Sequence, residues 1–203
     1  MPKHRDGSSV NPKAYGPLPM RISFDIDDTL VIHSDPGETE PCRVPAFLRS
    51  YFRERLRGGA PQLFQQLKQD GWEICIYTTS DRSEFYLRSW LRFYGVKVRV
   101  VVNQDKHFRD VVPRFPNKSA PSKHPGLFNI NLHVDDSQGV AMEGERHFFR
   151  TVIVEPNDSN WAEKILCVCR EISCIRKRNA AQQTVPPCPI PVLPTGIATT
   201  VST

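Results

Sequence analysis

One stretch decides the fold that we expect for this chain: Ile22-Ser23-Phe24-Asp25-Ile26-Asp27-Asp28-Thr29-Leu30. Apolar and polar residues alternate up to Asp27, which is the two-residue period of a β-strand. On a strand, Asp25 and Asp27 would point to the same side, about 6–7 Å apart. Two carboxylates this close repel each other, so a fold that keeps them together usually neutralises them with a metal or a shared proton. The stretch alone also fits an acidic turn in which Asp28-Thr29 caps a helix.

Length and composition limit the class of protein. The chain has 203 residues, enough for one domain with tails and a sizeable core. Its net charge of +5 permits phosphate-bearing or nucleic-acid partners without demanding them. No stretch approaches the roughly 18 apolar residues of a membrane span, and no signal-peptide core opens the chain. We therefore expect a soluble, cytoplasmic protein without a membrane partner. The six cysteines lack zinc-site spacing, and we expect reduced thiols.

Composition also divides the chain into three parts. Residues 1–19 are rich in Pro, Gly, Ser and basic residues without an apolar period, which predicts a flexible leader. Residues 20–176 alternate strand-like and helical patterns and are expected to form the folded domain. Residues 177–203 hold five prolines between positions 186 and 194, and we expect a disordered tail that serves as a linker or docking segment.

Hydrophobic periodicity predicts the elements of the folded part. Strands are expected at residues 20–26, 72–77, 96–102, 130–134 and 151–154. Helices are expected at residues 44–57, 61–70, 84–94 and 161–175, with Ser80 or Asp81 capping the third. Residues 103–126 show little regular pattern. Strands that alternate with helices predict an α/β fold, a Rossmann-like three-layer sandwich with a central, mainly parallel sheet.

The helix expected at residues 44–57 has arginines interleaved with its apolar positions: Arg49, Arg53, Arg55 and Arg57. These side chains could form a basic surface for an anionic substrate, including a nucleic acid. A solvated helix face, without a partner, is the commoner arrangement of such a pattern.

Three polar clusters follow three of the predicted strands. They are Asp25-Ile26-Asp27, Thr78-Thr79-Ser80 and Asp135-Asp136. Because ligands of parallel sheets bind at the carboxyl ends of the strands, we expect the clusters to meet in one crevice. Carboxylates there suit Mg²⁺, and hydroxyl groups with a lysine suit a phosphate. An aspartate can attack a phosphate once a metal and a lysine offset its charge, and a second carboxylate can move the proton.

The motifs resemble those of the haloacid dehalogenase (HAD) superfamily. The run from Asp25 to Thr29 matches that superfamily's DxDxT motif. Ile74-Cys75-Ile76-Tyr77-Thr78 looks like its second motif, and Val134-Asp135-Asp136 like its terminal acidic motif. The three occur in the expected order, and the similarity covers roughly residues 20 to 175.

The resemblance implies roles for these residues. Asp25 would be the nucleophile, and Asp27 the general acid and base. Thr78, with Thr79 beside it, would bind the phosphoryl group. Mg²⁺ would be held by the four carboxylate residues Asp25, Asp27, Asp135 and Asp136, with Asp27 reaching it through the backbone carbonyl.

The resemblance also requires a lysine, for which the chain offers two candidates. We prefer Lys123, because a lysine followed by proline and an apolar strand is similar to the superfamily's usual pattern. Lys118 remains the alternative and a candidate phosphate ligand. None of the six histidines has a metal-ligand spacing, and His133 is expected to pack inside the fold.

No inserted cap domain is evident after the first motif or before the lysine, which implies a capless or minimally capped, open site. In the superfamily such a site goes with macromolecular substrates or with a partner that supplies the lid. We therefore expect a Mg²⁺-dependent phosphohydrolase that acts on phosphate monoesters, small or macromolecular, through an aspartyl-phosphate. Two alternatives stay open, a non-catalytic protein that binds phosphate or nucleic acid and a phosphotransferase.

Overall fold

A computed structural model describes residues 19–33, 38–116 and 119–183. The predicted leader up to residue 18, Lys118, and residues 184–203 of the predicted tail lie outside these ranges. The chain divides into two compact units, Met1–Cys169 and Arg170–Thr203. Of the second unit, the structure describes the helical residues 170–183.

The first unit is built on a five-stranded sheet in which every neighbouring pair of strands is parallel. Its order is β3-β2-β1-β4-β5, so that the first strand is central. The strands are β1 (Met20–Phe24), β2 (Trp72–Tyr77), β3 (Val101–Val102), β4 (Leu132–Asp135) and β5 (Thr151–Ile153). The predicted α/β class with a parallel sheet is therefore confirmed.

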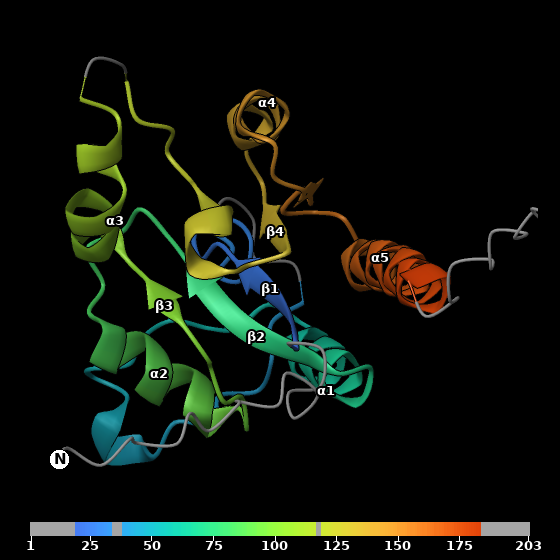
Figure 1. Ribbon diagram of the computed structural model, residues 1–203. Coiled ribbons are helices and arrows are strands. Elements are labelled where there is room, and N and C mark those ends of the chain that lie inside the picture. The colour runs from blue at the N-terminus through green and yellow to red at the C-terminus, as the bar shows by residue number, and fades with distance from the viewer. Residues whose placement is uncertain (1–18, 34–37, 117–118, 184–203) are drawn as a thin grey trace, which may run out of the picture. The chain divides into compact units, whose positions relative to one another are not determined.

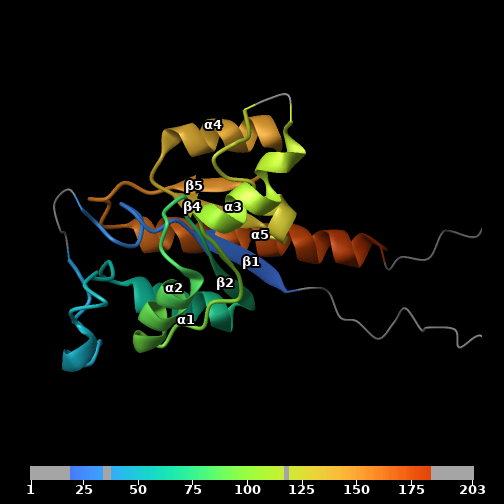
Figure 2. The same ribbon diagram turned by 90° about the vertical axis from the view of Figure 1, so that its left-hand side faces the viewer.

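Helices connect the strands and cover the sheet. The α-helices are α1 (Ala60–Gln69), α2 (Glu84–Phe93), α3 (Gln104–Asp110), α4 (Gln138–His147) and α5 (Trp161–Gln183). Short 3₁₀ helices occur at η2 (Ala46–Leu48), η3 (Val112–Arg114) and η4 (Pro125–Phe128). Figures 1 and 2 show α1 and α2 on one face of the sheet and α3 and α4 on the other. This gives the predicted three layers. No helix in the described ranges could cross a membrane, because none is both long and apolar enough.

The central strands are apolar because both faces of a parallel sheet are covered. Ile22 and Phe24 of β1 are fully buried, and the Phe24 ring meets Phe64 of α1 edge-on at 5.0 Å. Ser83 precedes helix α2 as its N-cap, and its hydroxyl accepts a hydrogen bond from the backbone N–H of Tyr86. The cap is therefore Ser83, and the prediction of Ser80 or Asp81 was wrong.

The predicted helix at residues 44–57 was also wrong. Only η2 forms there, without a side-chain cap, and a turn at residues 49–51 and a stretch without regular structure follow it. Backbone hydrogen bonds hold the end of the segment against distant residues, from Arg57 N–H to the Leu30 carbonyl and from Glu40 N–H to the Leu56 carbonyl. Arg57 itself is buried and donates to the carbonyls of Thr29 and Glu155. Tertiary pairing thus outweighs the helical pattern.

The bounds of the other helices and strands differ less from the predicted ones. Of the predicted strand at residues 96–102, only Val101–Val102 forms a ladder with β2, although Val96 and Val98 are buried. Residues 103–126, where little structure was expected, contain α3, η3 and the start of η4. Helix α4 was not predicted, and α5 continues to Gln183, beyond the predicted end at residue 175.

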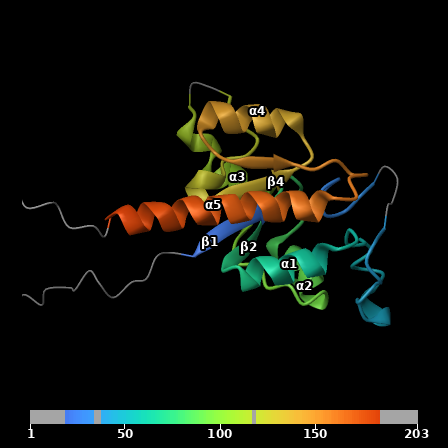
Figure 3. The same ribbon diagram turned by 90° about the vertical axis from the view of Figure 1, so that its right-hand side faces the viewer.

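The carboxyl ends of the strands point to the edge of the sheet where the loop after β1 lies. Figures 2 and 3 show η2 protruding on this same side of the first unit. The segments that follow β1, β2 and β4 therefore meet at one edge, and the segment carrying η2 borders it.

Candidate functional site

The centre of the site is an ion pair between Asp25 and Lys123. Asp25 directly follows β1 and keeps one strand-like bond, from its N–H to the Val134 carbonyl at 2.9 Å. Lys123, from the loop before η4, places its Nζ 2.5 Å from Asp25 Oδ1 and 3.1 Å from the Tyr77 carbonyl oxygen. Both side chains are buried, with 11 % of Asp25 and 4 % of Lys123 exposed. Of the two candidate lysines, Lys123 is thus the one whose place is described, and it touches the first motif.

Asp135, at the end of β4, lies on the other side of this lysine. Its Oδ2 is 3.6 Å from Lys123 Nζ and 3.0 Å from His133 Nε2, and its Oδ1 accepts from the Ser137 N–H. His133 is fully buried and its Nδ1 lies 2.8 Å from Ser23 Oγ. His133 therefore packs inside the fold, as the sequence indicated, and it also fixes the orientation of Asp135.

The pKa values of the carboxyl groups at this site are shifted in different directions. Burial raises the pKa of the Asp25 carboxyl, while the Lys123 ammonium acts in the opposite direction. Burial also acts to raise the pKa of Asp135, but the hydrogen bond from His133 and the charge of Lys123 outweigh it and lower that pKa. The pKa of Asp136 is raised by burial and by the neighbouring charge of Asp135. An excess of negative charge therefore collects at this edge of the sheet.

Asp27 has different partners from the Asp25–Lys123 ion pair. Strand β1 ends at Phe24, and a tight turn follows in which Leu30 N–H and Val31 N–H both donate to the Ile26 carbonyl. The expected strand geometry, with Asp25 and Asp27 on one side of a continuous strand, is therefore wrong. Asp27 instead receives two hydrogen bonds from one guanidinium group, that of Arg82, at 2.7 and 2.8 Å.

A second group, the His33 imidazole, also reaches Asp27, with Nε2 2.7 Å from Oδ1. Partial burial acts to raise the pKa of Asp27, but the bonds from Arg82 and His33 outweigh it and hold that pKa below its usual range. Asp27 is consequently a carboxylate at neutral pH, with 41 % of its side chain exposed.

The hydroxyl cluster lies next to the lysine. Thr78 is buried directly after β2, and its predecessor Tyr77 supplies the carbonyl that Lys123 contacts. The Thr78 hydroxyl accepts from the Ser80 N–H at 3.2 Å. A cavity of about 420 Å³ opens beside Thr79, lined by Thr79, Gln104, His107, Phe108, Val112 and Ala120. Of the two residues expected to bind phosphate, Thr79 thus lines this cavity, and Thr78 is the buried residue directly before it.

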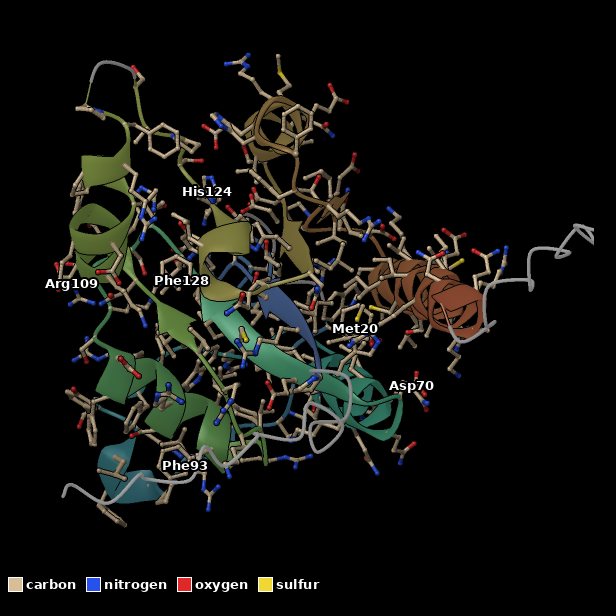
Figure 4. All side chains as sticks on the ribbon, in the orientation of Figure 1. Met20, Asp70, Phe93, Arg109, His124 and Phe128 are labelled. Atoms are coloured by element: carbon tan, nitrogen blue, oxygen red, sulfur yellow. The ribbon has the colours of Figure 1, made fainter. Side chains whose placement is uncertain are left out.

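Sequence reasoning missed the groups that hold the lysine loop. The Tyr77 hydroxyl lies 2.7 Å from His107 Nδ1 and accepts from the His124 N–H at 2.9 Å. Figure 4 labels His124 and Phe128 at the two ends of η4, above the end of β2. The Glu143 carboxylate accepts from the N–H and hydroxyl of Ser122, the residue before Lys123. The position of Tyr77 could have indicated its role, because its phenol comes immediately before the hydroxyl cluster at residues 78–80.

The partners of Asp27 were missed as well. Arg82 Nε donates to Glu54 Oε1 at 2.6 Å, so that the guanidinium joins two carboxylates. Arg82 follows the hydroxyl cluster by only two residues, a spacing that could have indicated its place. Glu54 could not have been found, because it reaches the site only when the predicted helix at residues 44–57 is absent.

The residues suit Mg²⁺ in their chemistry. Mg²⁺ is typically held by one or two carboxylates together with waters and phosphate oxygens. The pKa values of Asp25 and Asp136 are raised by burial first and then by the charge of Asp135, so that a bound cation would offset a strain on both carboxylates. Asp135, in contrast, already accepts from His133 and Ser137. No group of three or more His, Cys, Asp or Glu side chains with a metal-binding arrangement occurs in residues 19–33, 38–116 and 119–183.

Neither a protein-family model nor a curated protein matches the chain. Several solved structures are similar in fold at low sequence identity. One, described as the structure of a Pnkp1/Rnl/Hen1 complex, has a TM-score of 0.41 and 16 % identity over 72 % of this chain and 51 % of its own. The present chain therefore spans about half the length of that protein.

Two further structures match over most of their own length. The HAD domain of the effector protein Lem4 from Legionella pneumophila has a TM-score of 0.41 and 14 % identity, over 74 % of this chain and 93 % of its own. A predicted HAD-like family hydrolase from Porphyromonas gingivalis has a TM-score of 0.40 and 12 % identity, over 77 % and 98 %. Similarity at this level implies no shared activity.

Proposed function

We propose that this chain is a HAD-like, Mg²⁺-dependent phosphohydrolase that cleaves phosphate monoesters through an aspartyl-phosphate on Asp25. One observation carries the proposal. A buried carboxylate that follows the central strand is paired at 2.5 Å with a buried lysine, which also lies 3.6 Å from a second buried carboxylate, Asp135. Burying three charged groups is costly, and such an arrangement at the carboxyl edge of a parallel sheet is typical of a reacting centre.

In the first step Asp25 attacks phosphorus. One of its oxygens forms the new O–P bond while the bond from phosphorus to the leaving oxygen breaks, and the leaving oxygen takes a proton from Asp27. Lys123 holds the other oxygen of Asp25 and opposes the rise that burial causes in the pKa of this carboxyl. The Thr78 hydroxyl would donate to a phosphoryl oxygen.

In the second step water attacks the phosphorus of the aspartyl-phosphate. Asp27 takes the proton of the water, the O–P bond to Asp25 breaks, and Asp25 leaves as a carboxylate. The lowered pKa of Asp27 supports this role, because the residue is ionised at neutral pH and ready to accept a proton. Asp27 then carries the proton that it gives to the leaving oxygen in the next cycle, while His33, 2.7 Å from Asp27 Oδ1, helps to hold the carboxyl group in place.

Mg²⁺, held by Asp25, Asp136 and the Asp27 carbonyl, would offset the negative charge of the phosphoryl group. Of the two tasks that the resemblance implies for Asp135, holding Mg²⁺ and orienting the lysine, the second then fits its contacts better. Its bonds to His133 and Ser137 and its closeness to Lys123 suit it to orient the lysine. The absence of an inserted domain between β1 and α1 in the described ranges supports an open site.

The test is turnover of a panel of phosphate monoesters with Mg²⁺. We expect the wild type to release phosphate and Asp25→Asn to release none while keeping its circular dichroism spectrum. Asp70→Asn is the matched control, since Asp70 lies at the C-cap of α1, next to the amino end of β2. It should leave turnover unchanged. Turnover that survives Asp25→Asn, or that needs no divalent ion, would overturn the proposal.

A further inference from the structure

The segment that carries η2 exposes aromatic rings to an unusual degree. Phe47 is 81 % exposed and Tyr51 is 56 % exposed, and across from them Phe85 of α2 is 71 % exposed. Single exposed apolar residues are common, but several on neighbouring segments mark an interaction surface. Tyr51 and α2 are in contact, because the Tyr51 ring lies 5.6 Å from the ring of Tyr86, the residue after Phe85.

Arginines alternate with these rings along the same segment. Arg49, Arg53 and Arg55 are all exposed, and none of the three forms an ion pair with a residue of the described ranges. The one acidic residue among them, Glu54, is occupied by Arg82. We call this surface the aromatic–arginine face, defined by Phe47, Arg49, Tyr51, Arg53, Arg55 and Phe85. It offers positive charge and ring faces, and the nearest carboxylates in sequence, Glu54 and Glu84, are bound by Arg82 and Arg88.

The face is firmly attached to the fold. Phe52 stacks on Tyr86 at 5.0 Å and meets Phe93 at 5.3 Å, near the end of α2 where Figure 4 labels Phe93. The Trp90 indole N–H donates to the Glu54 carbonyl. The exposed rings therefore stand on a packed aromatic base and are presented without a large cost of ordering.

The face also leads to the reacting centre. Glu54, within the face's own segment, binds Arg82, and the same guanidinium binds Asp27. Asp27 is two residues from Asp25. A polymer lying on the face would thus bring its end to the carboxylates that follow β1.

We propose that the aromatic–arginine face binds single-stranded nucleic acid whose terminal phosphate monoester is the substrate of the site. This names a substrate class and rests on the proposed function. Arginines that are free of carboxylates suit a polymer with a charge at every residue, whereas a phosphopeptide would engage them only once. Exposed rings suit bases that are not already stacked in a duplex. An arginine guanidinium that lies over the face of a base adds a cation–π attraction to the stacking.

The experiment measures binding separately from turnover. A fluorescein-labelled oligothymidylate is titrated with full-length Asp25→Asn protein without Mg²⁺, and anisotropy is followed at several salt concentrations. In this background we expect Phe47→Ala/Phe85→Ala to weaken binding by about 25-fold or more, since each lost stacking contact costs about 5-fold or more. Both rings are mostly exposed, so their removal leaves the packing intact.

The arginines are tested by the salt dependence. Arg49→Gln/Arg53→Gln should reduce the slope of log affinity against log salt by about 1.4, because each phosphate contact on a single strand contributes about 0.7. Arg49→Lys/Arg53→Lys should keep most of the slope. One matched control is Phe148→Ala, which removes a ring that is 96 % exposed at the end of α4. The other is Arg99→Gln, because Arg99 bonds to the Ile74 carbonyl near the amino end of β2, away from the carboxyl ends of the strands. Both should bind like the parent.

Turnover then connects the face to the site. With otherwise wild-type protein, the paired phenylalanine substitutions should lower kcat/KM for 5′- or 3′-phosphorylated oligothymidylate and leave kcat/KM for p-nitrophenyl phosphate unchanged. Equal binding by the phenylalanine variant and its parent would overturn the assignment, as would equally tight, ring-dependent binding of polyglutamate. If binding behaves as expected but no phosphate ester is hydrolysed, the proposed function is wrong and the assignment of the face to nucleic acid is supported. If p-nitrophenyl phosphate is hydrolysed but binding does not depend on the rings, the assignment of the face is wrong and the proposed function is supported.

Discussion

Replacing Lys123 by methionine tests the electrostatics of the site without reference to activity. Lys123 is the cation nearest to two buried carboxylates, at 2.5 Å from Asp25 and 3.6 Å from Asp135. Methionine fills nearly the same volume, so that no large cavity adds to the effect. The substitution therefore isolates the cost of leaving the carboxylates without their cation.

The size of the effect follows from the burial. Only 11 % of the Asp25 side chain is exposed, so solvent cannot replace the lost ammonium. Removing one partner of a buried ion pair costs about 3–5 kcal/mol. We expect the free energy of unfolding of Lys123→Met to fall by that amount near neutral pH. The matched control is Lys97→Met, because Lys97 is exposed, and its change should stay within about 0.5 kcal/mol.

Urea unfolding followed by circular dichroism measures both variants and the double variant Asp25→Asn/Lys123→Met. Because asparagine removes the uncompensated charge, the double variant should regain about 2 kcal/mol relative to Lys123→Met. The loss should also depend on pH. Asp25 has a raised pKa in the folded state, and losing Lys123 raises it further, so Lys123→Met should be least destabilised at acidic pH and should lose stability as the pH rises above 3.8.

Two results would refute this reasoning. One is a loss below about 1 kcal/mol for Lys123→Met, which would place the pair in solvent rather than in the interior. The other is additivity of Asp25→Asn and Lys123→Met, which would mean that the two groups do not interact.

Three further outcomes are expected. His133→Phe should lower the free energy of unfolding by about 1–3 kcal/mol in urea titrations, since two buried hydrogen bonds are lost. Gly58→Ala should destabilise by about 1–3 kcal/mol, because the new Cβ would lie 2.6 Å from the Glu38 carbonyl oxygen. Arg82→Gln should raise the pKa of Asp27 and move the alkaline limb of the pH profile of kcat/KM to higher pH, because Asp27 then stays protonated to higher pH.

Each of these has a control or a contradicting outcome. Gly126→Ala is the control for Gly58, because its nearest heavy atom would be 4.0 Å from the new Cβ. A wild-type urea midpoint for His133→Phe would show that Asp135 needs no support. The lowered pKa of Asp27 stabilises the fold above pH 3.8, a contribution that is lost as the pH falls through the lowered pKa. Arg82→Gln should therefore differ least from the wild type in acid, and a difference that grows with acidification would contradict the pairing.

The sequence was sufficient for the sheet and for the positions of the polar clusters. Apolar runs such as Ile74–Tyr77 predict buried parallel strands by themselves, and the topology of such sheets brings their carboxyl ends together. Asp25 and Asp135 were therefore predictable as neighbours. The strands and the closeness of Asp25 to Asp135 were predictable because each strand, with the polar residues after it, is a pattern of a few consecutive residues.

The rest depends on contacts between distant residues. The pattern at residues 44–57 is helical, but Arg57 is drawn to the carbonyls of Thr29 and Glu155, which local propensity does not report. Lys123 could not be chosen firmly over Lys118, because its place is set by Glu143 holding Ser122. The separation of Asp27 from Asp25 likewise arises from the turn after β1 and from Arg82.

The most direct test of the proposed mechanism looks for the covalent intermediate itself. Protein turning over a phosphate monoester with Mg²⁺ is quenched in acid and its peptides are analysed by mass spectrometry. We predict the added mass of one phosphoryl group on the peptide that contains Asp25, removable by hydroxylamine as expected of an acyl phosphate. Release of phosphate with no such adduct, or an adduct on a different residue, would contradict the assignment of Asp25 as the nucleophile.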